Sequence, residues 1–167
     1  TLISILNMVM VTGVIQAVSK RVSERPELAG AIRLASMKLQ GLFGTGVFVA
    51  LLLGADWIAA DLLQDPSLAI LIRIGAVITL SYAFYGALVG VVNGLKRFAL
   101  QAGFDVGFAT MKVGLMIGLV VLGYGVQGAF TGFAAAAVII TVIALLVVSR
   151  QSPPGAHGAG DVKLLAF

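Results

Sequence analysis

Five long apolar runs constrain this chain more than any other feature of its sequence. They cover about residues 1–19, 40–60, 68–94, 98–122 and 126–148. Each approaches or exceeds the ~20 residues that an α-helix needs to cross a hydrocarbon core about 30 Å thick. Because lipid cannot satisfy backbone polar groups, runs of this length predict helices rather than alternating strands. We therefore predict an all-α, polytopic membrane protein with five transmembrane helices.

The composition excludes a soluble domain and several kinds of site. Hydrophobic residues make up 60% of the 167-residue chain and charged residues 11%, whereas soluble domains average about 45–50% and 25%. One core cannot bury this much apolar surface, so the remainder must face lipid. The chain contains no cysteine and one histidine. That composition excludes disulfides, thiolate ligands and histidine-rich metal clusters.

Charges between the runs predict how the helices are oriented. Bases occupy alternate connections, namely residues 20–38, 95–98 and 149–163. The two other connections, near residues 55–67 and 123–127, contain no base. By the positive-inside rule, the basic connections are expected in the cytoplasm. The net charge of +4 therefore reflects topology, and we expect no nucleic-acid partner.

The connections also suggest a domain organisation. Residues 1–150 are expected to form part of one transmembrane lobe, with Pro26 in the first turn of a short cytoplasmic helix. Residues 151–162, rich in Pro and Gly, predict a flexible linker. Residues 163–167, "KLLAF", look like the start of a following helix. The chain is expected to be a fragment of a longer protein.

Two opposite charges interrupt the fourth run. In "GFDVGFATMKVGL", Asp105 and Lys112 lie seven residues apart, which is nearly two helical turns. Each charge costs about 2.5–3.5 kcal/mol at the centre of a membrane helix, so both are expected to face protein or a water-filled cavity. Two interpretations remain open at this point. The charges form an internal ion pair that fixes helix packing, or they face a substrate or a coupling ion.

Five further polar residues are weaker candidates for the same cavity. Arg73 lies near the outer end of its run, where snorkelling to the interface and cavity lining are equally plausible. Tyr82 and Tyr85 lie near the middle of that run and need partners for their hydroxyl groups. Asn7 and Gln16 more often make interhelical hydrogen bonds than bind ligand in such positions.

Three other patterns favour structural explanations. Gly123, Gly125 and Gly128 match a dinucleotide-binding spacing, but the apolar helix that follows lacks a solvent-exposed side, so a turn between helices is the better interpretation. The acids of residues 55–67 flank Trp57 as in an extracytoplasmic loop with an aromatic anchor, and they give little support for a metal site. G-x-x-x-G spacings predict close helix packing at two places, Gly86 with Gly90 and Gly114 with Gly118.

Short motifs connect the chain to a known family. They are "GVIQAVSKRVSE" at the end of the first run, "GALVGVVNGLKRFALQAG" across the third connection, and "GYGVQGAFTGFAAA" between the last two runs. On these motifs the chain resembles the N-terminal half of a bacterial polysaccharide-biosynthesis membrane protein. The resemblance is to the O-antigen flippase type of the multidrug/oligosaccharidyl-lipid/polysaccharide (MOP) exporter superfamily, and it covers helices two to six of such a protein.

The resemblance implies a MATE-like lobe and a flippase rather than an enzyme. Such a protein moves a polyprenyl-pyrophosphate-linked oligosaccharide across the inner membrane by alternating access, for synthesis of lipopolysaccharide and other surface polysaccharide. Lys112 and Arg73 would attract the pyrophosphate or an acidic sugar, and Asp105 would temper the charge or bind a coupling ion, H⁺ or Na⁺. No other cofactor is implied, and the expected partners are the bilayer, a polymerase and glycosyltransferases. An ion-coupled multidrug or cation exporter is the main alternative, followed by a membrane-embedded transferase or a structural subunit.

Overall fold

The computed structural model describes the backbone of residues 2–151 and the side chains of residues 13–150. Five α-helices and four short helical turns make up this part of the chain, and no strand occurs in it. The helices are α1 (Leu2–Glu24), α2 (Ala29–Trp57), α3 (Ala69–Gly94), α4 (Phe98–Leu119) and α5 (Gly125–Gln151). The all-α prediction is thus confirmed. Gln151, the first residue of the predicted linker, ends α5. The rest of the linker, the following helix and His157 lie outside the described residues.

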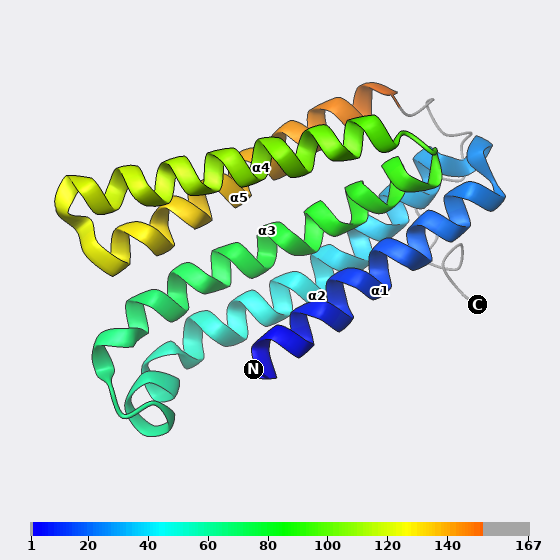
Figure 1. The fold of residues 1–167 in the computed structure, drawn as a ribbon. Helices are drawn as coiled ribbons and strands as arrows, with labels where there is room; N and C mark the ends of the chain where they lie inside the picture. The colour runs from blue at the N-terminus through cyan, green and yellow to red at the C-terminus, as the bar shows by residue number, and fades with distance from the viewer. Residues whose placement is uncertain (1, 152–167) are drawn as a thin grey trace.

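The helices run back and forth in a single bundle. Helix α3 packs against α1 and α2 on one side and against α5 on the other, and α4 packs mainly on α5 (Figure 1). Among the described residues, three helical stretches are long and apolar enough to cross a membrane: Pro26–Leu62, Pro66–Gly94 and Phe98–Arg150. The last stretch folds back on itself and comprises both α4 and α5. Large apolar side chains such as Leu53 and Val121 are 76% and 79% exposed, which suits a surface in contact with lipid.

The turn between α1 and α2 differs from the sequence prediction. A single 3₁₀ turn, Pro26–Leu28, separates the two helices, and α2 then continues without a break to Trp57. The expected short cytoplasmic helix is therefore the beginning of α2 itself. Residues 29–40 are mostly good helix formers, so the helix continues through them. The charged residues in this stretch indicate that it is surrounded by water rather than lipid, and they do not end the helix. Pro26 fits the turn because the first position of a helix needs no backbone N–H donor.

The connection between α2 and α3 is made of two short helical turns. A π-helical turn, Ile58–Leu62, extends α2, and a 3₁₀ turn, Pro66–Leu68, precedes α3. Asp65 caps the second turn, because its carboxylate accepts hydrogen bonds from the Ser67 backbone N–H at 2.9 Å and from the Ser67 hydroxyl at 2.6 Å. This capping role accounts for one of the three acids in the connection.

The other two connections are tight. Residues 95–97 join α3 to α4, with Lys96 at a φ of 58°. A π-helical turn, Val120–Tyr124, joins α4 to α5, where Gly123 and Gly125 adopt φ values of 92° and 53°. Glycine suits both positions because side chains rarely tolerate this backbone conformation. The G-x-G-x-x-G pattern thus forms a turn between helices, in agreement with the sequence interpretation.

Some of the glycines allow helices to approach closely, and others do not. A Cβ added at Gly90 would lie 2.8 Å from the Cβ of Val18 on α1, and one at Gly132 would lie 2.6 Å from the backbone of Leu115 on α4. Gly114 and Gly118 have no neighbouring atom within 4 Å of such a Cβ. The predicted packing role of this last pair therefore has no partner helix among the described residues. No other helix of the described residues packs on this face of α4, and α4 instead meets α5 through Gly128 and Gly132 of α5.

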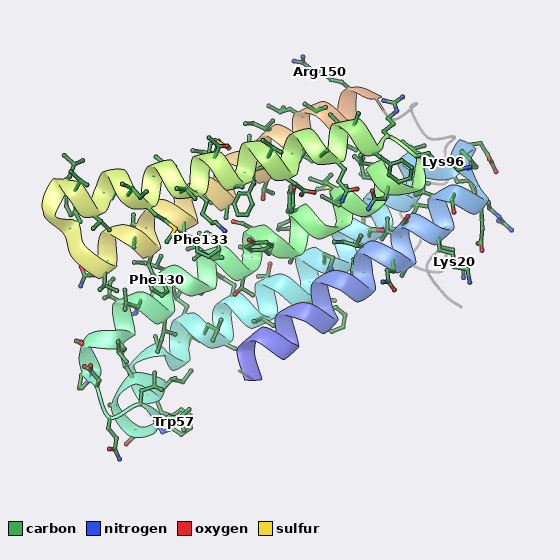
Figure 2. All side chains as sticks on the ribbon, in the orientation of Figure 1. Lys20, Trp57, Lys96, Phe130, Phe133 and Arg150 are labelled. Atoms are coloured by element: carbon green, nitrogen blue, oxygen red, sulfur yellow. The ribbon has the colours of Figure 1, made fainter. Side chains whose placement is uncertain are left out.

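Opposite charges mark the two ends of the bundle. Figure 2 shows Lys20, Lys96 and Arg150 together at one end, here called the basic end, and Trp57 at the other. The connection around Trp57 contains Asp56, Asp61 and Asp65, and its end of the bundle is called the acidic end. The alternation of basic and base-free connections read from the sequence thus corresponds to a physical separation of charge.

Candidate functional site

One face of α4 carries the residues that the sequence singled out most strongly. Asp105, Phe108 and Lys112 have the spacing i, i+3, i+7, which places them in a row along the helix. The middle of α4 lies between Phe108 and Ala109. At a rise of 1.5 Å per residue, Asp105 and Lys112 therefore lie ~5 Å on either side of the middle. Both charges belong to the interior of the helix rather than to its ends.

Four aromatic side chains from three helices meet at this row. Tyr82 and Tyr85 come from α3, Phe108 from α4 and Phe133 from α5. The Phe108 ring centroid lies 5.8 Å from that of Tyr82 and 6.2 Å from those of Tyr85 and Phe133. Tyr82 also meets Phe133 edge-on, with 6.2 Å between centroids. We call these four residues the aromatic cluster, and Figure 2 labels Phe133 within it.

The ammonium group of Lys112 lies over this cluster. Its Nζ is 5.6 Å from the centroid of Phe108 and 5.4 Å from that of Phe133. Both distances are within the range of a cation–π interaction, which is worth up to about 2 kcal/mol when the cation is desolvated. Within residues 13–150, ion pairs join Arg21 to Glu24 and Arg73 to Asp56, and none involves Lys112.

Asp105 has a different partner. Its Oδ1 accepts a hydrogen bond of 3.1 Å from the hydroxyl of Tyr85, a side chain that is 8% exposed. The carboxylate does not pair with Lys112, so the ion-pair interpretation of these charges is wrong. The physical reason is distance, because seven residues of helix separate the two Cα atoms by ~10 Å. The aromatic cluster lies between them and interacts with each charge separately.

Two other residues predicted to line the cavity, Arg73 and Gln16, do not belong to the aromatic cluster. Arg73 forms an ion pair with Asp56, with 2.8 Å between Nη2 and Oδ2, at the acidic end. Its guanidinium therefore reaches the end of the bundle, in agreement with the snorkelling alternative. Gln16 is exposed on α1, and the side chain of Asn7 lies outside the described residues.

Sequence reasoning did not identify Phe108 and Phe133 as members of the site. The sequence could have indicated Phe108, because this residue lies three positions after Asp105 and four before Lys112 and must share their helix face. The sequence could not have indicated Phe133, since nothing in it shows which residue of α5 meets this face of α4. Phe133 also lines an apolar pocket of about 410 Å³ toward the acidic end, together with Phe130 and Thr79.

The geometry brings a cation and a carboxylate to opposite sides of one aromatic surface. An unpaired ammonium group in an apolar setting attracts anions more strongly than it would in water, because the dielectric screening is weaker. The residues described here contain no group of three or more His, Asp and Glu side chains that could hold a metal ion. The site thus combines a cation, a carboxylate and four aromatic rings inside a helical bundle.

The chain matches no protein-family model, no curated protein and no solved structure.

Proposed function

We propose that this chain is one lobe of a membrane transporter, with α1 to α5 crossing the membrane and the basic end in the cytoplasm. Three observations support this proposal. The helices are long and apolar, their outer surfaces expose large apolar side chains, and the connections at one end of the bundle are rich in bases while the connection at the other end carries three aspartates and no base. The positive-inside rule gives the orientation. The MATE-like arrangement within the MOP superfamily is part of the same proposal.

The proposed cargo is a polyprenyl-pyrophosphate-linked oligosaccharide, moved across the bacterial inner membrane by alternating access. The observation that carries this proposal is Lys112, whose Nζ lies over two aromatic rings and joins no ion pair in the described part of the chain. An ionised residue at this depth needs a compensating anion, and the pyrophosphate of the cargo supplies one during transport. Polymerase and glycosyltransferase partners follow from such a cargo. We assign the chain no catalytic step.

Asp105 has a supporting part in this proposal. The Tyr85 hydroxyl fixes one of its carboxylate oxygens, and the other is free to bind H⁺ or Na⁺. Binding of the coupling ion would change the charge beside the aromatic cluster, about 10 Å along α4 from Lys112. The carboxylate and the lysine thus have separate tasks, ion coupling and cargo attraction.

The test is Lys112→Ala in the full-length protein, compared with Lys112→Arg and with Lys20→Ala at the basic end. We expect Lys112→Ala to abolish translocation of lipid-linked sugar in liposomes and surface polysaccharide in cells, while the protein still inserts. Lys112→Arg should retain part of the activity, and Lys20→Ala nearly all of it. Normal translocation by Lys112→Ala would overturn the proposed role of this residue.

An ion-coupled exporter of drugs or organic cations is the second candidate. The observation that favours it is the aromatic cluster beside Asp105, because aromatic faces and a carboxylate together suit a cationic cargo. The two candidates separate in a transport assay. A cation exporter should lose efflux of an aromatic cation in Asp105→Asn and retain it in Lys112→Ala, whereas the flippase should be most sensitive to Lys112.

A further inference from the structure

Arg33 on α2 is a half-buried cation, and two of its guanidinium nitrogens are fully buried. Its Nε and Nη1 atoms are inaccessible to solvent and have no hydrogen-bond partner in the described structure. Neither of the ion pairs among residues 13–150 includes it. Two unsatisfied donors of this kind are costly, because buried N–H groups are normally hydrogen-bonded. The arrangement therefore calls for an acceptor that the described protein atoms do not supply.

Asn93 on α3 carries another buried polar atom without a partner. Its Oδ1 is an acceptor and has no donor in the described structure. Helices α2 and α3 are antiparallel. A Cβ added at Gly41 would lie 3.4 Å from the Phe84 ring, and one added at Gly44 would lie 2.9 Å from the Cβ of Ala83. Extending this register toward the start of α2 brings Arg33 to the level of Asn93. A ligand at this level would need acceptor oxygens for the guanidinium and a hydroxyl donor for the amide oxygen.

An apolar pocket begins one turn further along α2. It has a volume of about 280 Å³ and lies between α1 and α2, where Ala17, Val18 and Leu39 form part of its wall. Ser36, Gln40 and Arg21 also line it. Gln40 follows Arg33 by seven residues, so the two side chains project from nearly the same face of α2. An apolar pocket with guanidinium groups at its basic end suits an amphiphilic ligand, whose apolar chain would occupy the pocket and whose charged group would meet the guanidinium groups.

The surroundings favour an anionic ligand at this end. The connections of the basic end carry many more bases than acids, and the two acids of the first connection are Glu24 and Glu27. Basic pockets between membrane helices bind the headgroups of anionic lipids, and clusters of bases next to the membrane raise the local concentration of such lipids. Phosphate oxygens are suitable acceptors for a guanidinium group.

We propose that Arg33 and Asn93 bind the headgroup of an anionic, glycerol-headed phospholipid, and that an acyl chain of this lipid occupies the pocket between α1 and α2. The phosphate accepts hydrogen bonds from Arg33, and a headgroup hydroxyl donates to Asn93 Oδ1. The lipid thereby joins α1, α2 and α3 at the basic end. This site is separate from the aromatic cluster and does not depend on what the protein transports.

Thermal unfolding of the full-length protein in detergent tests the proposal. We expect phosphatidylglycerol to raise the melting temperature by several degrees in a concentration-dependent manner, because a ligand that binds only the folded state stabilises it. Phosphatidylcholine and inorganic phosphate should each have a much smaller effect. Equal stabilisation by both lipids would overturn the headgroup assignment, and full stabilisation by inorganic phosphate would overturn the lipid assignment.

Two variants locate the site, and one matched variant controls for charge. Arg33→Gln should remove most of the stabilisation by phosphatidylglycerol and most of the anionic lipid that copurifies, as measured by native mass spectrometry. Lys38→Gln removes an exposed base from the same helix and should leave both measurements nearly unchanged. Ala17→Leu narrows the pocket and should weaken lipid binding with the basic residues intact, which keeps the proposal testable if Arg33→Gln fails to fold.

Equal loss in Arg33→Gln and Lys38→Gln would show a diffuse surface-charge effect and overturn the proposed site. Normal lipid binding by Ala17→Leu would overturn the assignment of the acyl chain to the pocket. Transport is not the measurement in these experiments. A failed lipid test therefore leaves the proposed transport function standing, and a failed transport test leaves the lipid site standing.

Discussion

The two halves of the bundle are packed differently. Toward the basic end, α1, α3 and α5 share a continuous core in which Val22, Leu88 and Val91 are fully buried. Toward the acidic end, an apolar pocket of about 410 Å³ separates parts of α2, α3 and α5. The aromatic cluster lies between these regions. The helices of the basic half are therefore packed tightly against one another, and the aromatic cluster lies where they begin to separate.

Small residues explain much of this difference. At the basic end, a Cβ added at Gly94 would lie 2.7 Å from the backbone oxygen of Ser19, so α1 and α3 are in direct backbone contact there. Gly75, near the other end of α3, has no atom within 4 Å of the corresponding position. In lipid, close packing of this kind holds helices together, since the hydrophobic effect does not distinguish lipid from another apolar helix.

The largest effect that tests the comparison is expected from Leu88→Ala. Leu88 is completely buried, and removing such a side chain from a core costs about 2–5 kcal/mol. Leu53→Ala is the matched control, because Leu53 is 76% exposed toward the acidic end. Its replacement should change stability by less than about 0.5 kcal/mol. Equal destabilisation of the two variants, measured by unfolding in detergent, would contradict the difference between the halves.

Gly94→Ala should have the next largest effect. The added methyl group overlaps Ser19 and Val22 on α1, and overpacking of this kind costs about 1–3 kcal/mol. Gly75→Ala places the same methyl group on the same helix in open space and should be nearly neutral. The measurement is again unfolding in detergent. A neutral Gly94→Ala would show that α1 is not held tightly against α3.

Tyr85→Phe should have the smallest effect on stability of these three changes. It removes the hydroxyl that donates to Asp105, and the loss of one hydrogen bond costs about 0.5–1.5 kcal/mol. Tyr82→Phe retains the ring contacts of the cluster and is the matched control. If Asp105 binds a coupling ion, Tyr85→Phe should also change the ion dependence of transport more than Tyr82→Phe does. Identical behaviour of the two variants would argue against a specific role for the Tyr85–Asp105 contact.

The sequence predicted the helices well where apolar runs ended at turn-forming residues. The predicted run 68–94 corresponds to α3, Ala69–Gly94, and the glycine-rich turn after α4 is located where the pattern placed it. The apolar run 40–60 forms only the later part of α2, which begins about three turns earlier at Ala29, so the separate cytoplasmic helix that was predicted before it is continuous with it. Hydrophobicity reports which solvent surrounds a helix, whereas helix propensity and capping decide where the helix ends.

Helical spacing predicted one part of the geometry around Asp105 and Lys112 and left another part open. Helical spacing placed Asp105 and Lys112 on one face of α4, together with Phe108. Spacing did not reveal that the two charges have separate partners, since both Tyr85 and Phe133 come from other helices. It also left Arg73 between two alternatives, and the choice depended on the position of Asp56 on α2.

The sequence by itself determined that the chain is helical, that much of its surface suits lipid, and which connections carry the positive charge. These properties depend on composition and on the helical period, which are local. Only the tertiary structure decided which faces meet. It therefore decided that Lys112 lies over two aromatic rings and that two nitrogens of Arg33 are buried without a partner in the described part of the chain. The physical reason is that helix pairing results from many weak contacts between distant residues, and a small residue allows close approach only where another helix is present.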